Sequence, residues 1–184
     1  MKRLSAKEIM AASFRELARE RPIDKITVKE ITANCDYSQA TFYRQFKDKY
    51  DLIAWSYSRD LEAIMRPLAD GTRTFRQILL DAAAYYWDHR DYLANLFQHT
   101  SGYDSFVGNM TDIHCCCLRD AILKIAEQNS LDNLTLLYIR LYCVGTVQIS
   151  CEWILGRHPI SVAQLAEVYE NALPRPLRPY FLEK

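Results

Sequence analysis

Hydrophobic residues recur every three or four positions along most of this 184-residue chain, which is the period of an α-helix and not of a strand. Polar segments with helix-capping residues separate these stretches. The pattern therefore predicts an all-α protein. We expect helices at about residues 5–20, 27–34, 38–44, 48–67, 74–89, 91–98, 103–128, 131–156 and 161–173. The remaining tail holds three closely spaced prolines, so it should be extended and pack along the body.

The most informative part of the pattern lies at residues 27–52. Thr27 and Glu30 have the spacing of a capping box at the start of a short helix, and Ser38 can cap a second one. Asp36 stands between the two helices and can adopt the left-handed conformation that a tight turn often requires. Two short helices joined by a tight turn are typical of the helix-turn-helix motif that reads DNA.

The second of these helices has one apolar side and one polar side. Phe42 and Phe46 stand four residues apart and should face the core. Its other positions are small, polar, aromatic or cationic: Gln39, Ala40, Thr41, Tyr43 and Arg44. Gln and Arg side chains can read base edges, hydroxyl groups can reach phosphates, and Ala permits close approach. This helix is therefore predicted to lie against DNA.

The same residues resemble the N-terminal domain of TetR-type bacterial transcriptional regulators. Eight positions match the pattern of that family in order and spacing: Thr27, Ile31, Ser38, Thr41, Tyr43, Phe46, Lys49 and Leu52. One departure is Asp36 followed by Tyr37, where the family usually has Gly and a small apolar residue. The resemblance covers about residues 5–55. It implies a helix-turn-helix domain at residues 1–47 and a helical effector-binding and dimerisation domain at residues 48–184.

The resemblance also implies a function. A homodimer would bind a palindromic double-stranded DNA operator, and a small-molecule effector in the body would change its DNA affinity. The helix that starts near Asp48 would link the two domains, so motion along it would change the spacing of the two DNA readers. We expect phosphate contacts from Thr27, Thr41, Tyr43 and Lys49, base contacts from Gln39 and Arg44, a helix cap at Ser38 and close approach at Ala40.

Dimerisation is predicted at about residues 131–173. The helix expected at 131–156 is apolar on more than one face, through Leu134, Leu137, Tyr138, Leu141, Tyr142, Val144, Val147, Ile149, Trp153 and Ile154. Such a helix must be covered on more than one side, and a twofold partner satisfies that need. The resemblance implies the same arrangement. The alternative is a central helix of a monomer.

The effector pocket is predicted less sharply. Aromatic residues with polar atoms commonly line such cavities, and the body offers Trp55, Tyr86, Trp87, Phe97, Tyr103, Tyr138 and Tyr142. The alternative, which such residues more often follow, is that each of them is an ordinary core residue. A weaker resemblance to the branch linked to the dihydroxyacetone kinase operon implies control by a protein partner. Transcriptional activation is therefore an alternative to action as a repressor.

Composition and charge agree with a DNA-binding protein. The formal net charge is zero, but residues 1–50 carry 11 Lys and Arg against 7 Asp and Glu, which places a basic reader on an acidic body. We find no signal peptide and no run of 18 apolar residues, so we expect a cytoplasmic protein without a membrane span. No catalytic motif stands out, so we expect neither an enzyme nor a cofactor. A helical enzyme with a borrowed N-terminal domain, or an interaction module, are the alternatives.

The cluster His114-Cys115-Cys116-Cys117 invites a metal or redox interpretation. Consecutive helical residues point about 100° apart, so only His114 and Cys117 share a face, and we predict no metal site. Cysteines in a reducing compartment are usually free, and they behave as small buried hydrophobes. A thiol or metal sensor that also uses Cys143 and Cys151 is the alternative.

Overall fold

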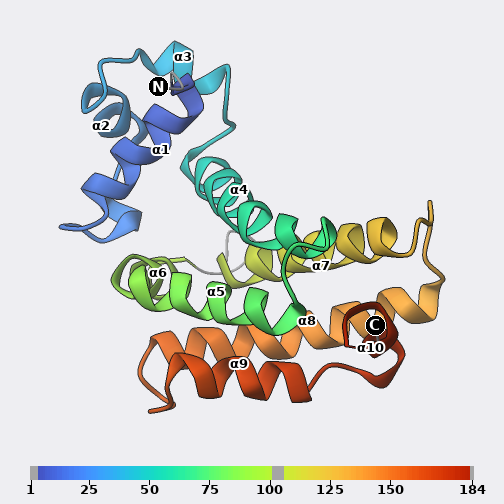
Figure 1. Ribbon diagram of the computed structural model, residues 1–184. Coiled ribbons are helices and arrows are strands. Elements are labelled where there is room, and N and C mark those ends of the chain that lie inside the picture. The colour runs from blue at the N-terminus through green and yellow to red at the C-terminus, as the bar shows by residue number, and fades with distance from the viewer. Residues whose placement is uncertain (1–3, 101–105, 183–184) are drawn as a thin grey trace.

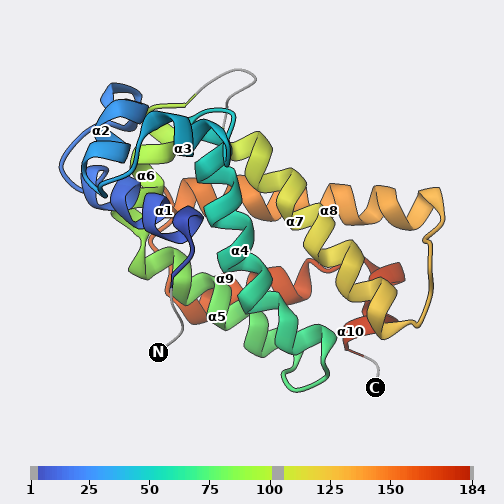
Figure 2. The ribbon, with the colours of Figure 1, turned by 90° about the horizontal axis from the view of Figure 1, so that it is seen from above.

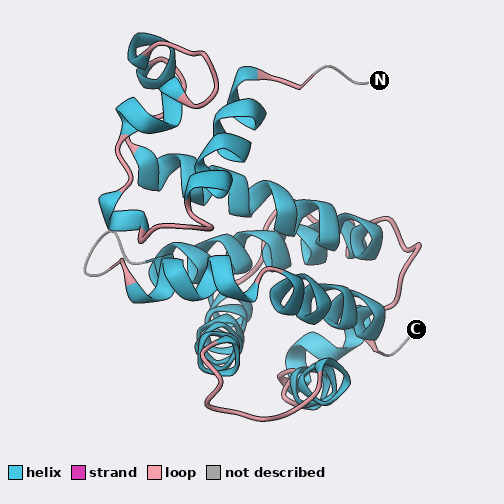
Figure 3. Cartoon of the chain, turned by 90° about the vertical axis from the view of Figure 1, so that its left-hand side faces the viewer, coloured by secondary structure: helices cyan, strands magenta, loops and turns pink. Residues whose placement is uncertain are grey.

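A computed structural model describes residues 4–100 and 106–182, and all the regular structure in those residues is helical (Figures 1 and 3). The predicted all-α class is confirmed. The elements are α1 (Ala6–Leu17), η1 (Ile23–Lys25), α2 (Val28–Ala33), α3 (Gln39–Tyr43), α4 (Lys49–Ala69), α5 (Phe75–Asp88), α6 (Arg90–Gln98), α7 (Phe106–Ile125), α8 (Asn133–Ile154), α9 (Val162–Asn171), η3 (Arg175–Leu177) and α10 (Arg178–Phe181).

Helices α1, α2 and α3 enclose a core at one end of the molecule (Figure 1). The side chains of Met10 and Phe14 from α1, Ile31 from α2 and Phe42 from α3 are fully buried. Phe46 follows α3 and is 3% exposed, so both phenylalanines of the predicted apolar side face the core as expected. Their burial fixes which side of α3 remains outside.

Helix α1 ends at Leu17, three residues earlier than the sequence predicts. The amide of Arg19 donates to the Glu16 carbonyl (3.2 Å), and the amide of Glu20 donates to the Leu17 carbonyl (3.3 Å). These bonds span three residues and not four, so the chain tightens into turns before Pro22. Capping signals predicted the start of this helix well, but nothing comparable marked its end.

Helix α4 carries the chain from this three-helix unit into the body, where it packs mainly against α7 (Figures 1 and 2). The helix was predicted to end at Pro67, but it continues to Ala69 with that proline in its last turn. Leu68 is 5% exposed and packs into the body, which favours the extra residues. Gly71 then closes the end with a φ of +69°.

The remaining helices form the body. α5 packs on α9, and α7 packs on α8. The prediction that the tail is extended was wrong, because the tail folds into η3 and α10. Leu177 and Phe181 from these turns are buried, and the Phe181 ring stacks on Phe75 of α5 at 4.8 Å. Each proline of η3 and α10 sits in the first turn of a helix, where its missing N–H costs nothing.

Candidate DNA-binding surface and internal cavity

The two short helices predicted at residues 27–44 are present with their predicted caps. Thr27 and Glu30 form a reciprocal capping box at the start of α2. The Ser38 hydroxyl accepts the amide of Thr41 (3.1 Å) at the start of α3. Between them Asp36 has a φ of +57°, the left-handed conformation that the sequence predicted for the turn. Residues 27–44 therefore form a helix-turn-helix.

One side of α3 faces outward. Gln39, Ala40, Tyr43 and Arg44 are exposed, and the Tyr43 side chain is 57% exposed although it is aromatic. Its ring packs edge-on against the buried Phe42, which fixes its direction without covering it. An exposed aromatic hydroxyl beside an amide and a guanidinium is a surface with donors for both bases and phosphates.

The Ser38 and Thr41 hydroxyls at the start of α3 form a hydrogen-bonded group with the Arg44 guanidinium. The Ser38 and Thr41 hydroxyls are 3.0 Å apart, and Arg44 Nη2 donates to the Thr41 hydroxyl (3.0 Å). These three groups are close together at the surface, where an acceptor on DNA could replace the internal partner of the guanidinium. The geometry keeps Arg44 near the outer side of α3.

Lys49 has a different environment from the one expected. Its ammonium donates to the carbonyls of Ile23 (2.8 Å), Asp24 (3.0 Å) and Ile26 (2.8 Å), which uses all three of its donors. Burial lowers the pKa of Lys49. The side chain fastens η1 to the start of α4, so we do not retain it as a phosphate contact.

Thr27 is exposed, but its hydrogen-bond donors are also used within the protein. Its backbone amide and its hydroxyl both donate to the Glu30 carboxylate, at 2.8 and 2.7 Å. No donor on Thr27 remains for a phosphate, so we remove it from the expected contacts as well. Lys47, which the sequence reasoning passed over, lies in the loop after α3 with an exposed side chain that pairs with no described residue. In the sequence, the only indication of a role for Lys47 is a cationic residue next to the helix-turn-helix motif.

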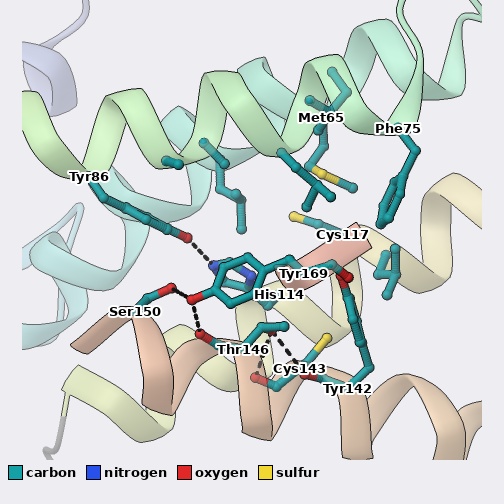
Figure 4. A pocket seen from close by; sticks show the side chains of 16 residues that line it. Met65, Phe75, Tyr86, His114, Cys117, Tyr142, Cys143, Thr146, Ser150 and Tyr169 are labelled. Carbon is teal, nitrogen blue, oxygen red and sulfur yellow. Dashed lines mark hydrogen bonds between the residues drawn. The ribbon is translucent and has the colours of Figure 1, made fainter. Parts of the chain in front are cut away.

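The body contains an internal cavity of about 60 Å³ between α4, α5, α7, α8 and α9 (Figure 4). Much of its lining is apolar, with Leu61, Met65, Phe75, Ile78, Leu79, Ala82, Ala83 and Leu118. Its polar atoms come from Tyr86, His114, Tyr142, Thr146, Ser150 and Tyr169, and Cys117 and Cys143 complete the wall. Apolar walls with a few polar groups are typical of small-molecule sites, although the volume is below the usual range.

Three side chains from three helices meet at one end of the cavity. His114 Nε2 on α7 lies 2.7 Å from the Tyr57 hydroxyl on α4 and 3.0 Å from the Tyr86 hydroxyl on α5, and the two hydroxyls are 3.2 Å apart. Burial lowers the pKa of His114 to about 4 and raises the pKa of Tyr57 and Tyr86. All three groups are therefore neutral at physiological pH.

A second polar group lines the wall formed by α8 and α9. The Tyr169 hydroxyl donates to the Thr146 carbonyl (2.9 Å) and contacts the Ser150 hydroxyl (2.7 Å), as Figure 4 shows. The Tyr142 hydroxyl donates to the Tyr169 carbonyl (2.8 Å). These bonds hold α9 to α8 and leave hydroxyl oxygens on the wall.

Only part of the expected aromatic set lines this cavity. Tyr86 and Tyr142 do, whereas Tyr103 lies outside the described residues. The others lie elsewhere: Trp55 packs on Phe46, Trp87 on Trp153 and Phe97 on Phe106. Tyr138 is partly buried against the core of the body. We therefore leave Trp55, Trp87, Phe97 and Tyr138 out of the candidate site. His114, Ser150 and Tyr169 were missed, because composition does not reveal which helices enclose a space.

The cysteines differ in burial and in the pKa of their thiols. Within residues 4–100 and 106–182, no three His, Cys, Asp or Glu side chains gather closely enough to hold a metal ion. Cys115 on α7 hydrogen-bonds with Cys143 on α8 and lies 3.9 Å from Arg140 Nη1. The bond from Cys143, followed by the nearby guanidinium, lowers the pKa of Cys115 to about 7. The Cys143 thiol is buried, and its pKa is raised.

Two sets of hydrogen bonds connect the body with the helix-turn-helix unit. Arg15 of α1 donates to Ser56 (2.8 Å) and pairs with Asp60 on α4. On α6, Asn95 accepts the amide of Ile23 (3.2 Å) and donates to two carbonyls that precede η1, those of Ala18 and Arg21. Both α4 and α6 thus hold the reader at defined points.

Helix α8 presents an apolar stripe that nothing in the described chain covers. Its exposed positions Leu134, Leu137, Leu141 and Val144 recur at helical spacing, and Leu141 is 67% exposed. Val168 on α9 is exposed beside the groove between the two helices. By length and composition alone α8 could cross a membrane, but core helices of soluble proteins meet the same criterion. A stripe of this kind fits a partner helix.

Sequence comparison identifies the N-terminal segment. Residues 9–54 match the family model for bacterial regulatory proteins of the tetR family. The search of curated proteins finds no match.

Solved structures resemble the whole chain. The dihydroxyacetone kinase operon activator DhaS has a TM-score of 0.61 at 18% identity and covers 91% of this chain and 93% of its own. A TetR transcriptional regulator from Rhodococcus sp. RHA1 has a TM-score of 0.64 at 15% identity, covering 90% and 95%. The repressor FadR from Thermus thermophilus, in complex with lauroyl-CoA, has a TM-score of 0.62 at 17% identity, covering 91% and 92%. At these identities the likeness shows the fold.

Proposed function

We propose that this chain, a transcriptional regulator that carries the TetR-family N-terminal domain, binds a palindromic operator as a homodimer and responds to a small molecule in its body. The observation that carries the proposal is the exposed side of α3, with Gln39, Tyr43 and Arg44 outward and Phe42 buried behind them. Proteins of this family bind DNA and are generally not enzymes, so we propose no catalytic role and a cytoplasmic location.

In this proposal α3 lies in the major groove. Gln39 and Arg44 reach base edges, because an amide and a guanidinium have the donor geometry for adenine and guanine. The Thr41 and Tyr43 hydroxyls and the Lys47 ammonium meet phosphates, which positions the helix and makes binding depend on salt. Ser38 contributes as the helix cap, and Ala40 leaves room for the DNA backbone.

The second reader comes from a twofold copy. The exposed stripe on α8, with Leu137 and Leu141 as its most exposed members, would pack against the same stripe of the partner together with Val168 of α9. Burying several leucines on each side supplies the apolar core that a stable dimer needs. Figure 1 shows α8 and α9 at the opposite side of the molecule from α1–α3, which leaves both readers free to reach DNA.

Control would pass through α4. Tyr57, in the middle of α4, contacts the cavity residues His114 and Tyr86 through its hydroxyl. The same helix begins shortly after the reader and bonds with Arg15 of α1. A ligand that favours one position of α4 shifts the population of dimers whose readers fit the operator. It changes DNA affinity only by the difference between its affinities for the two states.

Selection of bound duplexes from a pool of random oligonucleotides tests the function. We expect the selected sequences to contain two half-sites related by twofold symmetry and spaced by about one helical turn or a multiple of it. A pool in which no sequence becomes enriched after repeated rounds, with folded protein, would refute the proposal. Enrichment of single, unpaired half-sites would refute the dimer alone.

A second candidate is a thiol-responsive regulator, which the contact between Cys115 and Cys143 favours. Hydrogen peroxide would oxidise the Cys115 thiolate to a sulfenic acid and release hydroxide, which takes up the proton that the thiol had lost and becomes water. The Cys143 thiol would then attack the sulfenic acid, form a disulfide and release a second water. One peroxide is reduced and two thiols are oxidised. The bond would tie α7 to α8 next to the cavity.

Hydrogen peroxide provides the test of this candidate. Treated protein should lose two hydrogens by mass and change its affinity for the selected duplex, and Cys115→Ser should abolish both effects. Cys151→Ser is the matched control, because Cys151 is buried on α8 and burial raises the pKa of its thiol. Equal responses of the two variants would rule out the pair. Control by a protein partner stays a prediction, because the likeness to DhaS shows the fold alone.

A further inference from the structure

The chemistry of the cavity defines the class of molecule that it can hold. No Lys, Arg, Asp or Glu is among the described residues that line it, and His114 is neutral. A charged ligand would lose its hydration without gaining a counter-ion, which costs several kcal/mol at the least. The walls therefore reject anions and cations and accept a neutral molecule.

The hydrogen-bond inventory of the α8 and α9 wall restricts the ligand further. The Tyr169 proton goes to the Thr146 carbonyl, so Ser150 must donate its own proton to the Tyr169 oxygen. Tyr142 donates to the Tyr169 carbonyl, and the Thr146 hydroxyl donates to the Tyr142 carbonyl (2.9 Å). Every hydroxyl proton on this wall is used inside the protein. What remains toward the cavity is lone pairs, which require a donor on the ligand.

The His114 end of the cavity, which Figure 4 shows beside Tyr169, offers the complementary group. His114 Nδ1 has no hydrogen-bond partner among the residues that the structure describes, while Nε2 contacts two hydroxyls. If Nε2 accepts from Tyr57 or Tyr86, the imidazole proton sits on Nδ1 and is unused. If Nε2 is protonated instead, one tyrosine proton is left over. Either tautomer leaves one donor at this end, which a ligand oxygen can accept.

We propose that the cavity binds a compact, neutral, apolar molecule with one hydroxyl group, which donates to the α8 and α9 wall and accepts from the His114 end. This inference rests on the proposed function, since it names the effector class for the same site. The cavity of about 60 Å³ is smaller than the roughly 150 Å³ that holds benzene, so binding must widen it. Met65 on α4 and Leu79 on α5 are half-buried lining residues that can move, and displacement of Met65 would act directly on α4.

Calorimetric titration of the full chain without DNA tests the proposal with phenol as the probe. Toluene has nearly the same shape without the hydroxyl, and benzoate has the same ring with a charge. We expect phenol to bind and benzoate not to bind. Toluene should bind at least about fivefold more weakly than phenol, because a buried hydrogen bond contributes about 1 kcal/mol. Toluene that binds as tightly as phenol, benzoate that binds, or phenol that fails to bind each overturns the proposal.

Two variants place the binding in this cavity. Ser150→Ala removes one acceptor from the wall and should weaken phenol about fivefold without affecting toluene. Ser58→Ala is the matched control, since Ser58 lies on α4 outside the cavity and bonds with Glu62. Equal losses in both variants, or none in either, would overturn the location. Phenol binding by a protein that selects no DNA would refute the proposed function and leave this inference standing.

Discussion

The neutral imidazole of His114 should make the stability of this protein depend on pH. The ring is enclosed by α4, α5 and α7, and burial lowers its pKa from 6.5 to about 4. In the unfolded chain the imidazole takes up a proton below pH 6.5, whereas the folded protein does not protonate it until about pH 4. The contribution of neutral His114 to the stability of the folded protein is therefore fully present above pH 6.5, and it is lost as the pH falls from 6.5 to about 4.

The size of the effect follows from the two pKa values. The interval between 6.5 and about 4 corresponds to about 3 kcal/mol in the limit of low pH. About 2 kcal/mol of this should already be lost at about pH 5, which is a large part of the stability of a small domain. Carboxylates and the other histidines also contribute to the pH dependence of stability, so only a difference between variants isolates the contribution of His114.

Urea unfolding at about pH 7.5 and about pH 5, at one protein concentration, measures this difference. We expect His114→Gln to reduce the loss between the two pH values by about 2 kcal/mol relative to the native chain. His89→Gln is the matched control, because the His89 Nδ1 donates to the Tyr85 carbonyl (2.8 Å) at the end of α5, away from the cavity. A His114→Gln variant that loses as much stability between the two pH values as the native chain would show that His114 does not cause this pH dependence.

Four further variants test the contacts described above. Lys49→Ala should cost about 2 kcal/mol of stability, through three lost charge-assisted hydrogen bonds at a partly exposed site, and leave the salt dependence of DNA binding unchanged. Lys47→Ala should do the reverse and reduce the slope of log affinity against log salt by about one, so a variant pair with equal slopes contradicts both assignments. Leu137→Glu should yield monomers in sedimentation and weaken operator binding. Leu182→Glu, at an exposed leucine outside α8, is the control and should do neither. Dimers of Leu137→Glu would exclude the α8 stripe as the interface. Asn95→Ala should speed hydrogen exchange of the Ile23 amide, which donates to Asn95 at the start of η1. Unchanged exchange would show that this contact from α6 does not stabilise the reader.

The helix-turn-helix could be predicted because its signals are local. The capping box of Thr27 and Glu30, the left-handed Asp36 and the buried pair of Phe42 and Phe46 each act within a few residues. Periodicity and caps also predicted most helix starts in the body. They failed at Pro67 and in the tail, where long-range packing of residues such as Leu68 decides the local conformation.

The cavity and the contacts of individual side chains could not be predicted in the same way. The residues that line the cavity belong to five helices, so their meeting depends on how those helices cross. Lys49 fits the family pattern, but only the structure shows that three carbonyls take its donors. Trp55 has the character of a pocket residue, and its position against Phe46 follows from packing that the sequence does not encode locally.

Whether α3 reads base pairs can be measured by the binding of Gln39→Ala to duplexes that are changed one base pair at a time. The duplexes derive from the selected operator, and Gln128→Ala, an exposed residue of the same type after α7, is the control. We predict that Gln39→Ala loses about 1–3 kcal/mol of discrimination at one symmetry-related position in each half-site and keeps the native preference elsewhere. Unchanged discrimination at every position, or a uniform loss that the Gln128→Ala control shares, would mean that Gln39 on α3 does not read a base pair.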